Sequence, residues 1–127
     1  MRLITLHVVS RTILAGVIDE MRTLGPPKIR VADCGDHYFA LEGTHRIEAA
    51  RLLALPVILD IRQGNSLLDV GQMDIAMSWD DELPTMEMRV DEVVAKLRCD
   101  CNGEYWLSDD GTPELVRAAP KYYVPPL

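Results

Sequence analysis

The sequence lacks any apolar run long enough to cross a lipid bilayer. Its longest apolar stretches, such as residues 52–58, are far shorter than the roughly 18 to 20 residues that a transmembrane helix needs. It also has only three cysteines, an odd number without the spacing of a disulfide framework. We therefore expect a globular protein with free thiols in the cytoplasm, not a membrane protein or a secreted domain held by disulfides.

Positive charge is also scarce. Thirteen Lys and Arg against twenty Asp and Glu give a net charge of −7 at pH 7, so the chain as a whole repels the phosphates of nucleic acids. DNA is therefore an unlikely partner. A DNA-binding or nuclease module stays open as an alternative because eight basic residues gather in the first 63 positions: Arg2, Arg11, Arg22, Lys28, Arg30, Arg46, Arg51 and Arg62.

A zinc-binding pattern is missing as well. Cys99 and Cys101 are separated by one residue, whereas structural zinc sites usually have two pairs of ligands, with two to four residues between the members of a pair. Only Cys34 and the scattered histidines remain to complete a tetrahedral set. We therefore predict no metal site at the cysteines.

The chain does have enough apolar material for one core, since 48% of its 127 residues are hydrophobic. Ser10 is a good N-cap for an amphipathic helix, which Gly25 and two following prolines end. Gly35-Asp36 joins two β-prone runs into a hairpin. The expected elements of the first half are a strand at 2–9, a helix at 11–24, strands at 28–34 and 37–41, a helix at 44–54 and a strand at 57–61.

The second half is less regular, and we place a boundary near Gly64. Residues 65–82 are expected to form a lid, loop or short helix, and residues 120–127 an extended tail. The other expected elements are a helix at 89–98, a hairpin of 98–101 with 104–107 around Asn102-Gly103, and a short helix at 112–117 that Pro113 opens. We thus predict an α+β protein, with one domain at 1–63 and a C-terminal extension at 64–127 packed on it.

The most informative segment follows the predicted hairpin. Its second strand delivers Gly43 to the start of a helix, where unpaired backbone N–H groups carry a partial positive charge. Arg46 adds a planar fork suited to phosphate or carboxylate oxygens, and Thr44 and His45 add further donors. The segment therefore predicts an anion-binding site.

Residues 42–50, Glu-Gly-Thr-His-Arg-Ile-Glu-Ala-Ala, together with residues 53–57, resemble the G-x-H-R-x-x-A-A helix of the ParB/sulfiredoxin superfamily, the ParB-like nuclease domains. The preceding β-α-β-β order also matches, so the resemblance covers about residues 1–63. It implies a small mixed sheet with packed helices, and the binding of ATP, ADP or CTP phosphates by Gly43, Thr44, His45 and Arg46.

The chain departs from the known members of that family. Sulfiredoxins have their catalytic cysteine where this sequence has Thr44, so we do not expect reduction of sulfinic acids. The second phosphate motif and the helix-turn-helix of the partition proteins are missing, so we do not expect a CTP-switched DNA clamp. The free serine kinases are longer and need an acidic base, for which Glu20, Asp36 and Glu42 are the candidates.

Three functions stay open. The leading hypothesis is a protein that binds a nucleotide or another phosphorylated small molecule, with Glu42 and His45 as candidate catalytic residues of a small phosphotransferase or hydrolase. A carboxylate beside bound phosphates commonly holds Mg²⁺, which makes Glu42 a candidate for that role too. The alternatives are the DNA-binding module and a non-catalytic interaction module, such as a homodimer. In the last case His45 and Arg46 only cap the helix and form ion pairs with Glu42 or Glu48.

Overall fold

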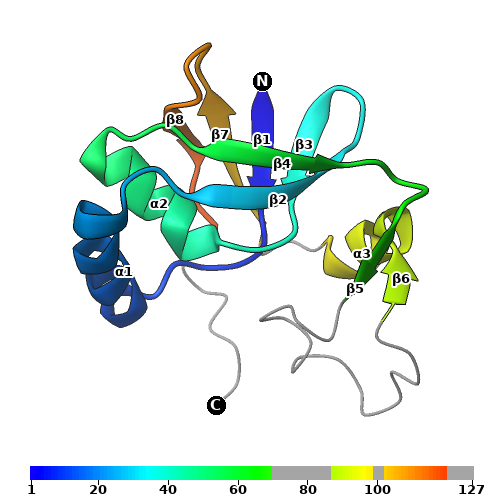
Figure 1. The fold of residues 1–127 in the computed structure, drawn as a ribbon, viewed down its shortest axis with the longest axis horizontal. Helices are drawn as coiled ribbons and strands as arrows, with labels where there is room; N and C mark the ends of the chain where they lie inside the picture. Colours follow the sequence, from blue (N-terminus) through cyan, green and yellow to red (C-terminus); the bar gives the residue numbers. More distant parts are fainter. Residues whose placement is uncertain (70–86, 99–101, 120–127) are drawn as a thin grey trace.

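A six-stranded mixed sheet forms the centre of the computed structural model, which describes residues 1–69, 87–98 and 102–119 (Figure 1). The strand order is β4-β2-β3-β1-β7-β8, and β5 and β6 pair separately. The elements are β1 (Arg2–Thr5), α1 (Arg11–Leu24), β2 (Lys28–Asp33), β3 (His37–Ala40), α2 (Thr44–Leu53), β4 (Ile58–Arg62), β5 (Leu67–Asp69), β6 (Glu87–Arg89), α3 (Val90–Leu97), β7 (Gly103–Leu107) and β8 (Pro113–Arg117). The predicted α+β class is confirmed.

The elements of the first half form near the predicted positions, except that the strand expected at 2–9 ends at Thr5. The Ser10 side chain accepts a hydrogen bond from the backbone N–H of Ile13, and Gly25 ends α1 with a φ of 78°. Strands β2 and β3 form the expected hairpin, in which Val31 lies opposite Ala40. Parallel pairing of β1 with β3 and of β2 with β4 completes this part of the sheet.

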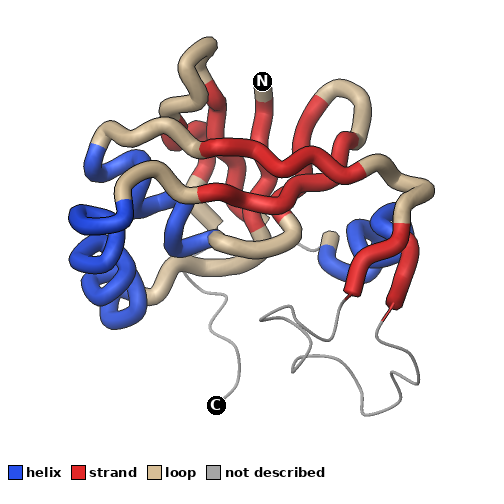
Figure 2. The backbone as a smooth tube through the Cα atoms, viewed as in Figure 1, coloured by secondary structure: helices blue, strands red, loops and turns tan. Residues whose placement is uncertain are grey.

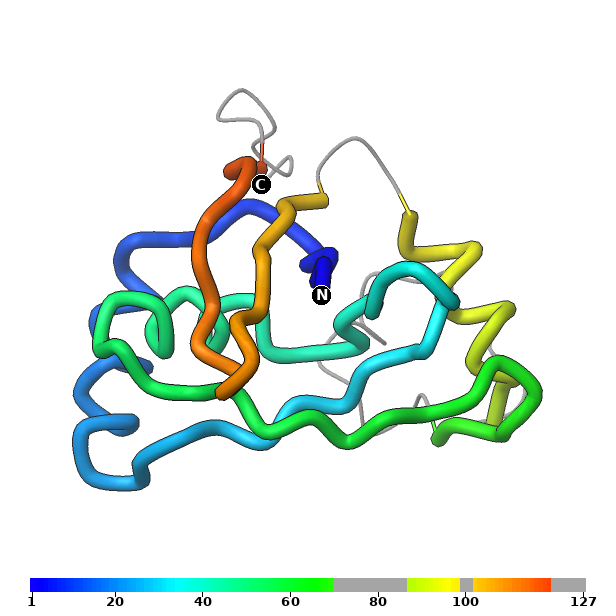
Figure 3. The backbone as a smooth tube through the Cα atoms, turned by 90° about the horizontal axis from the view of Figure 1, so that it is seen from above, coloured from blue at the N-terminus to red at the C-terminus, as the bar shows by residue number. Residues whose placement is uncertain are grey.

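Helices pack on both faces of the sheet, so it carries two apolar clusters. Successive strand residues point to opposite faces. On β1, Leu3 joins the cluster that packs against α1 and α2, whereas Ile4 joins the cluster that packs against α3. Helices α1 and α2 contact each other, and α3 lies at the other end of the molecule, beside β5 and β6 (Figures 2 and 3).

One expectation for the second half is wrong. The short helix expected at 112–117 is a strand, β8, because the free edge of β7 offers it backbone partners; Pro113 is tolerated as its first residue. Strand β7 pairs with β1 and β8, and the expected hairpin partner at 99–101 lies outside the described residues. The expected helix at 89–98 is present as α3.

The remaining expectations for the second half fall largely on residues that the structure does not describe. These are most of the segment 65–82, residues 99–101 and the tail 120–127. Of the segment 65–82, residues 67–69 form β5. No helix of the described residues is long and apolar enough to span a membrane.

Candidate functional site

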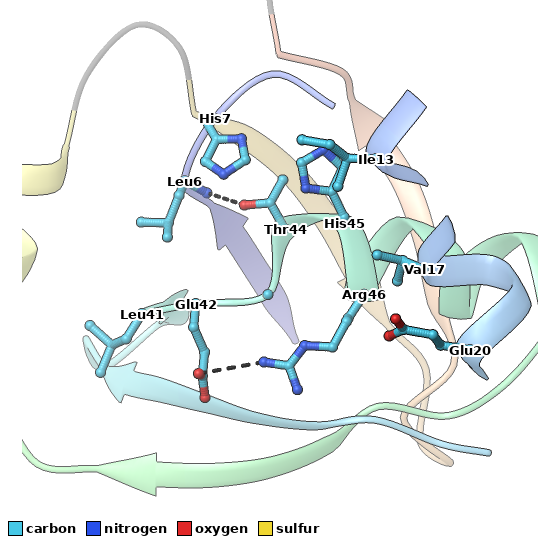
Figure 4. Close-up of a pocket in the computed structure, with 11 residues that line it drawn as sticks. Leu6, His7, Ile13, Val17, Glu20, Leu41, Glu42, Thr44, His45 and Arg46 are labelled. Carbon is cyan, nitrogen blue, oxygen red and sulfur yellow. Dashed lines mark hydrogen bonds and ion pairs between the residues drawn. The ribbon is translucent and has the colours of Figure 1, made fainter. Parts of the chain in front are cut away.

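A cavity of about 200 Å³ lies at the start of α2 (Figure 4). Its walls come from three segments: the chain just after β1, one side of α1, and residues 41–46 between β3 and α2. All five residues that the sequence selected, Glu42, Gly43, Thr44, His45 and Arg46, line it. Leu6, Ile13, Val17 and Leu41 supply an apolar part of the wall.

Gly43 is the N-cap of α2 and makes no side-chain capping bond. Its φ of 78° and ψ of 28° lie in the left-handed region, and a Cβ atom there would come within 2.5 Å of the Ile29 side chain. Both the conformation and the space therefore require glycine. Because Gly43 has no side chain, no acidic or hydroxyl group of the N-cap bonds to the first backbone N–H groups of α2. The partially positive end of the helix therefore lies beside the cavity without such a partner.

Thr44 joins the start of α2 to the end of β1. Its side chain is buried, and its Oγ1 accepts a hydrogen bond from the backbone N–H of Leu6 at 3.2 Å. This contact fixes the chain that leads into His7, another residue of the cavity wall.

His45 connects α2 to the start of α1. Its Nε2 lies 2.9 Å from the backbone N of Ser10 and accepts that N–H, so the neutral ring carries its proton on Nδ1. The His7 ring lies beside it, with 5.3 Å between the ring centroids. Burial, and then the charge of His7, lower the pKa of His45 below its ordinary value. His45 is therefore neutral at pH 7.

Glu42 is held by two arginines. Its carboxylate accepts hydrogen bonds from the guanidinium and the backbone N–H of Arg30, and Arg46 lies 3.4 Å away. Burial opposes ionisation of Glu42, but the hydrogen bonds from Arg30 and the positive charges of Arg30 and Arg46 outweigh it and hold the pKa below its usual value. Glu42 is thus a carboxylate whose oxygens already have partners.

Arg46 crosses the lower part of the cavity in Figure 4 and points toward Glu42. Its Nη1 donates a hydrogen bond to the backbone carbonyl of Lys28 at 3.2 Å, and 38% of its side chain is exposed. Glu20 of α1 lies beside the stem of Arg46. Arg46 is therefore the more accessible of the two arginines that hold Glu42.

Sequence reasoning missed three residues of this arrangement: Arg30, His7 and Ser10 in its contact with His45. The contact of Arg30 could have been predicted from the sequence. A two-residue turn at Gly35-Asp36 sets the hairpin register, which places Arg30 opposite the residue that precedes Glu42. The contacts of His7 and Ser10 with α2 could not have been predicted, because they depend on how distant segments pack.

Within the described ranges, no group of three or more His, Cys, Asp or Glu side chains is arranged to hold a metal ion. Cys34 is half-buried and contacts Arg98, whose Nη2 lies 3.5 Å from Sγ. Cys99 and Cys101 lie outside the described residues. Asp36, a candidate acid in the sequence, lies at the β2–β3 turn beside His37 and does not line the cavity.

Comparison with family models, curated proteins and solved structures finds no match for this chain.

Proposed function

We propose that the protein binds a small phosphate-bearing anion, a nucleotide being the leading case, at the start of α2. The observation that carries the proposal is the uncapped Gly43 N-terminus of a ten-residue helix, beside a cavity of about 200 Å³. Backbone N–H groups at such a position favour negative charge. The resemblance of residues 42–50 to a phosphate-binding helix supports the same ligand class.

The ion pairs around Glu42 support a role for Arg46 in binding. Arg30 holds Glu42 with contacts of 3.0 to 3.1 Å, whereas Arg46 is 3.4 Å away and more exposed. Arg46 can therefore turn to an anion while Glu42 keeps its principal partner. In binding a phosphate, the Arg46 guanidinium would exchange the Glu42 carboxylate for another negatively charged partner.

The contacts of the other predicted residues favour binding over catalysis. A carboxylate with a lowered pKa is a weak general base, and the Nε2 lone pair of His45 already accepts the Ser10 N–H. Phosphoryl transfer or hydrolysis with Mg²⁺ is thus the secondary form of the proposal. It requires Glu42 or His45 to exchange its present partner for a ligand.

The same contacts give the second candidate its support. Thr44, His45, Glu42 and Arg46 all have partners inside the protein, as they would in an interaction module that needs no ligand. The two candidates differ in one measurable property, which is the response of the fold to small anions.

A thermal-shift screen tests the proposal. The full chain is titrated with pyrophosphate, ATP, ADP and CTP, each with and without Mg²⁺. A ligand at 100 times its dissociation constant stabilises the folded state by about 2.7 kcal/mol, which raises the midpoint by several degrees in a chain of this size. No shift with any of these compounds would favour the interaction module, and a gel shift that persists at about 0.15 M salt would favour the DNA-binding module.

A further inference from the structure

His7 holds a fixed place between two cavities. The N–H of Leu6 donates to Thr44 Oγ1, and Asn102 Nδ2 donates to the carbonyls of Thr5 and Leu6 at 3.1 Å each, so the chain before His7 is tied on two sides. His7 lines the cavity at the start of α2 and also a second, smaller cavity of about 80 Å³.

The hydrogen bonds of the two cavity histidines assign their tautomers. His7 Nδ1 lies 2.9 Å from the carbonyl oxygen of Val8, so Nδ1 carries the proton and donates it. The Nε2 of neutral His7 then has a lone pair, and no described residue donates to it. In His45 the arrangement is reversed, because Nε2 accepts the Ser10 N–H. As far as the described residues show, His7 is thus the ring of the two whose second nitrogen accepts no hydrogen bond.

Protonation of the two rings is also coupled by their distance. With 5.3 Å between the centroids, a charge on one ring disfavours a charge on the other. A proton on His45 Nε2 would in addition break the bond from Ser10. Protonation of His45 would therefore cost a hydrogen bond that protonation of His7 Nε2 leaves intact.

The charged and titratable groups that share a cavity with His7 are Glu20, Glu42, His45 and Arg46 on one side, and Glu48, Tyr105 and Arg117 on the other. Glu42 is held by Arg30, and Glu48 by Arg51 and Tyr105, so neither carboxylate depends on His7 for a partner. An anion at the start of α2 would thus be a new partner for a protonated His7.

We propose that His7, and not His45, is the residue that exchanges a proton with the anion bound at the start of α2. The inference rests on the proposed function, since it requires an anion at that site. Protonated His7 adds a positive charge and an N–H donor from the β1 side of the cavity, opposite Arg46. The site then binds more strongly at low pH and releases its anion as His7 loses its proton.

Sulfate is the probe, because it stays a dianion throughout the pH range in which histidine titrates. An NMR titration of the three histidines of the full wild-type chain is recorded in sulfate and in chloride at equal ionic strength. We expect sulfate to raise the midpoint of His7 by about one pH unit, which corresponds to about tenfold tighter binding to the protonated form. His37, outside both cavities, should keep its midpoint, and the midpoint of His45 should not rise.

A matched pair of variants gives a second measurement. The stabilisation by sulfate is compared at about pH 5.5 and about pH 8, on either side of the ordinary histidine pKa. His7→Asn keeps a donor near the Val8 carbonyl and should remove the pH dependence, whereas His37→Asn should keep it. Each variant lacks one histidine, so the comparison between the two variants cancels the change in net charge with pH.

The outcomes separate the two proposals. If sulfate stabilises the protein but moves the midpoint of His45, or of neither ring, the assignment to His7 is overturned and anion binding stands. If sulfate has no effect on stability at either pH, no anion site exists at the start of α2, and both proposals fall.

Discussion

The Glu42 carboxylate accepts three hydrogen bonds from a single residue, Arg30: one from the backbone N–H at 3.1 Å, one from Nε at 3.0 Å and one from Nη2 at 3.1 Å. The pair joins β2 to the segment that leads into α2. Because Arg46 also approaches Glu42, the carboxylate sets the position of both arginines near the cavity. Stability and the proposed anion binding are thus linked through Glu42.

Glu42→Gln is expected to lower the free energy of unfolding by about 1–3 kcal/mol, because a neutral amide is a weaker partner for the half-buried Arg30. Asp60→Asn is the matched control, since Asp60 holds Arg62 in a similar way but in a more exposed pair. It should cost less than Glu42→Gln, because solvent screens the more exposed pair. Urea denaturation at neutral pH measures both, and equal losses would show that Arg30 and Glu42 are an ordinary surface pair.

The lowered pKa of Glu42 predicts how this loss depends on pH. In the unfolded chain Glu42 titrates near its ordinary pKa of about 4.3, and in the folded protein it titrates lower. Its contribution to stability is therefore complete above the unfolded value and disappears as the pH falls through the folded value. Urea midpoints of the wild type and of Glu42→Gln should converge below about pH 4, and a constant difference down to about pH 2 would contradict this.

The lowered pKa of His45 predicts that stability also depends on pH in a higher range than for Glu42. Burial, followed by the charge of His7, lowers its folded pKa, so the unfolded chain takes up this proton first as the pH falls. The stability that neutral His45 contributes is complete above about pH 6.5 and is lost as the pH falls toward the folded pKa. At pH 8, His45→Asn should lower the free energy of unfolding by about 1 kcal/mol, because the variant loses the contact with Ser10. At about pH 5.5 the same substitution should lower it by less. A loss independent of pH would refute the lowered pKa.

The first half of the fold was predictable because its signals are local. Ser10 and Gly25 mark the ends of α1, and the turn at Gly35-Asp36 sets the register of β2 and β3. The pairing of β1 with β7 has no such signal, since it joins residues such as Leu3 and Tyr105 that are about a hundred positions apart. Thr112 and Pro113 locally predict the start of a helix, whereas β8 forms because β7 offers this segment backbone partners.

The candidate site also has a part that local sequence predicts and a part that only packing determines. Residues 42–46 are consecutive, so one motif identifies all of them and the helix start places them together. Their partners come from elsewhere: Arg30 from β2, His7 from the end of β1 and Ser10 from the start of α1. The pattern therefore predicted which residues gather, whereas packing decides which of their atoms are already engaged.

Arg46→Ala is expected to reduce anion affinity about ten- to a hundredfold, because it removes a charge-assisted contact. Stability should change by less than about 1 kcal/mol, since the side chain is partly exposed and Glu42 keeps Arg30. Arg46→Lys should restore only part of the affinity, because an ammonium lacks the planar fork. Arg22→Ala on the exposed side of α1 controls for net charge. Affinities come from the thermal-shift titration with pyrophosphate, and unchanged affinity with a large loss of stability would make Arg46 structural.

Gly43→Ala should destabilise the protein for two reasons that can be measured separately. The left-handed φ of 78° costs an alanine about 1–2 kcal/mol, and the new Cβ would lie 2.5 Å from Ile29 Cδ1, in the fully buried core. Gly35→Ala isolates the first reason, because Gly35 has a φ of 91° and no atom within 4 Å of the added Cβ. We expect Gly43→Ala to cost about 1–3 kcal/mol more than Gly35→Ala.

Ile29→Val tests the second reason, since it deletes the Cδ1 atom that an alanine at position 43 would meet. Alone, this substitution should cost about 0.5–1.5 kcal/mol. Combined with Gly43→Ala it should cost less than the sum of the two single losses, because the space left by Cδ1 accommodates the new Cβ. Urea denaturation of the four proteins completes the cycle. Additive losses would mean that Ile29 does not restrict position 43, and that glycine is required there by its backbone conformation alone.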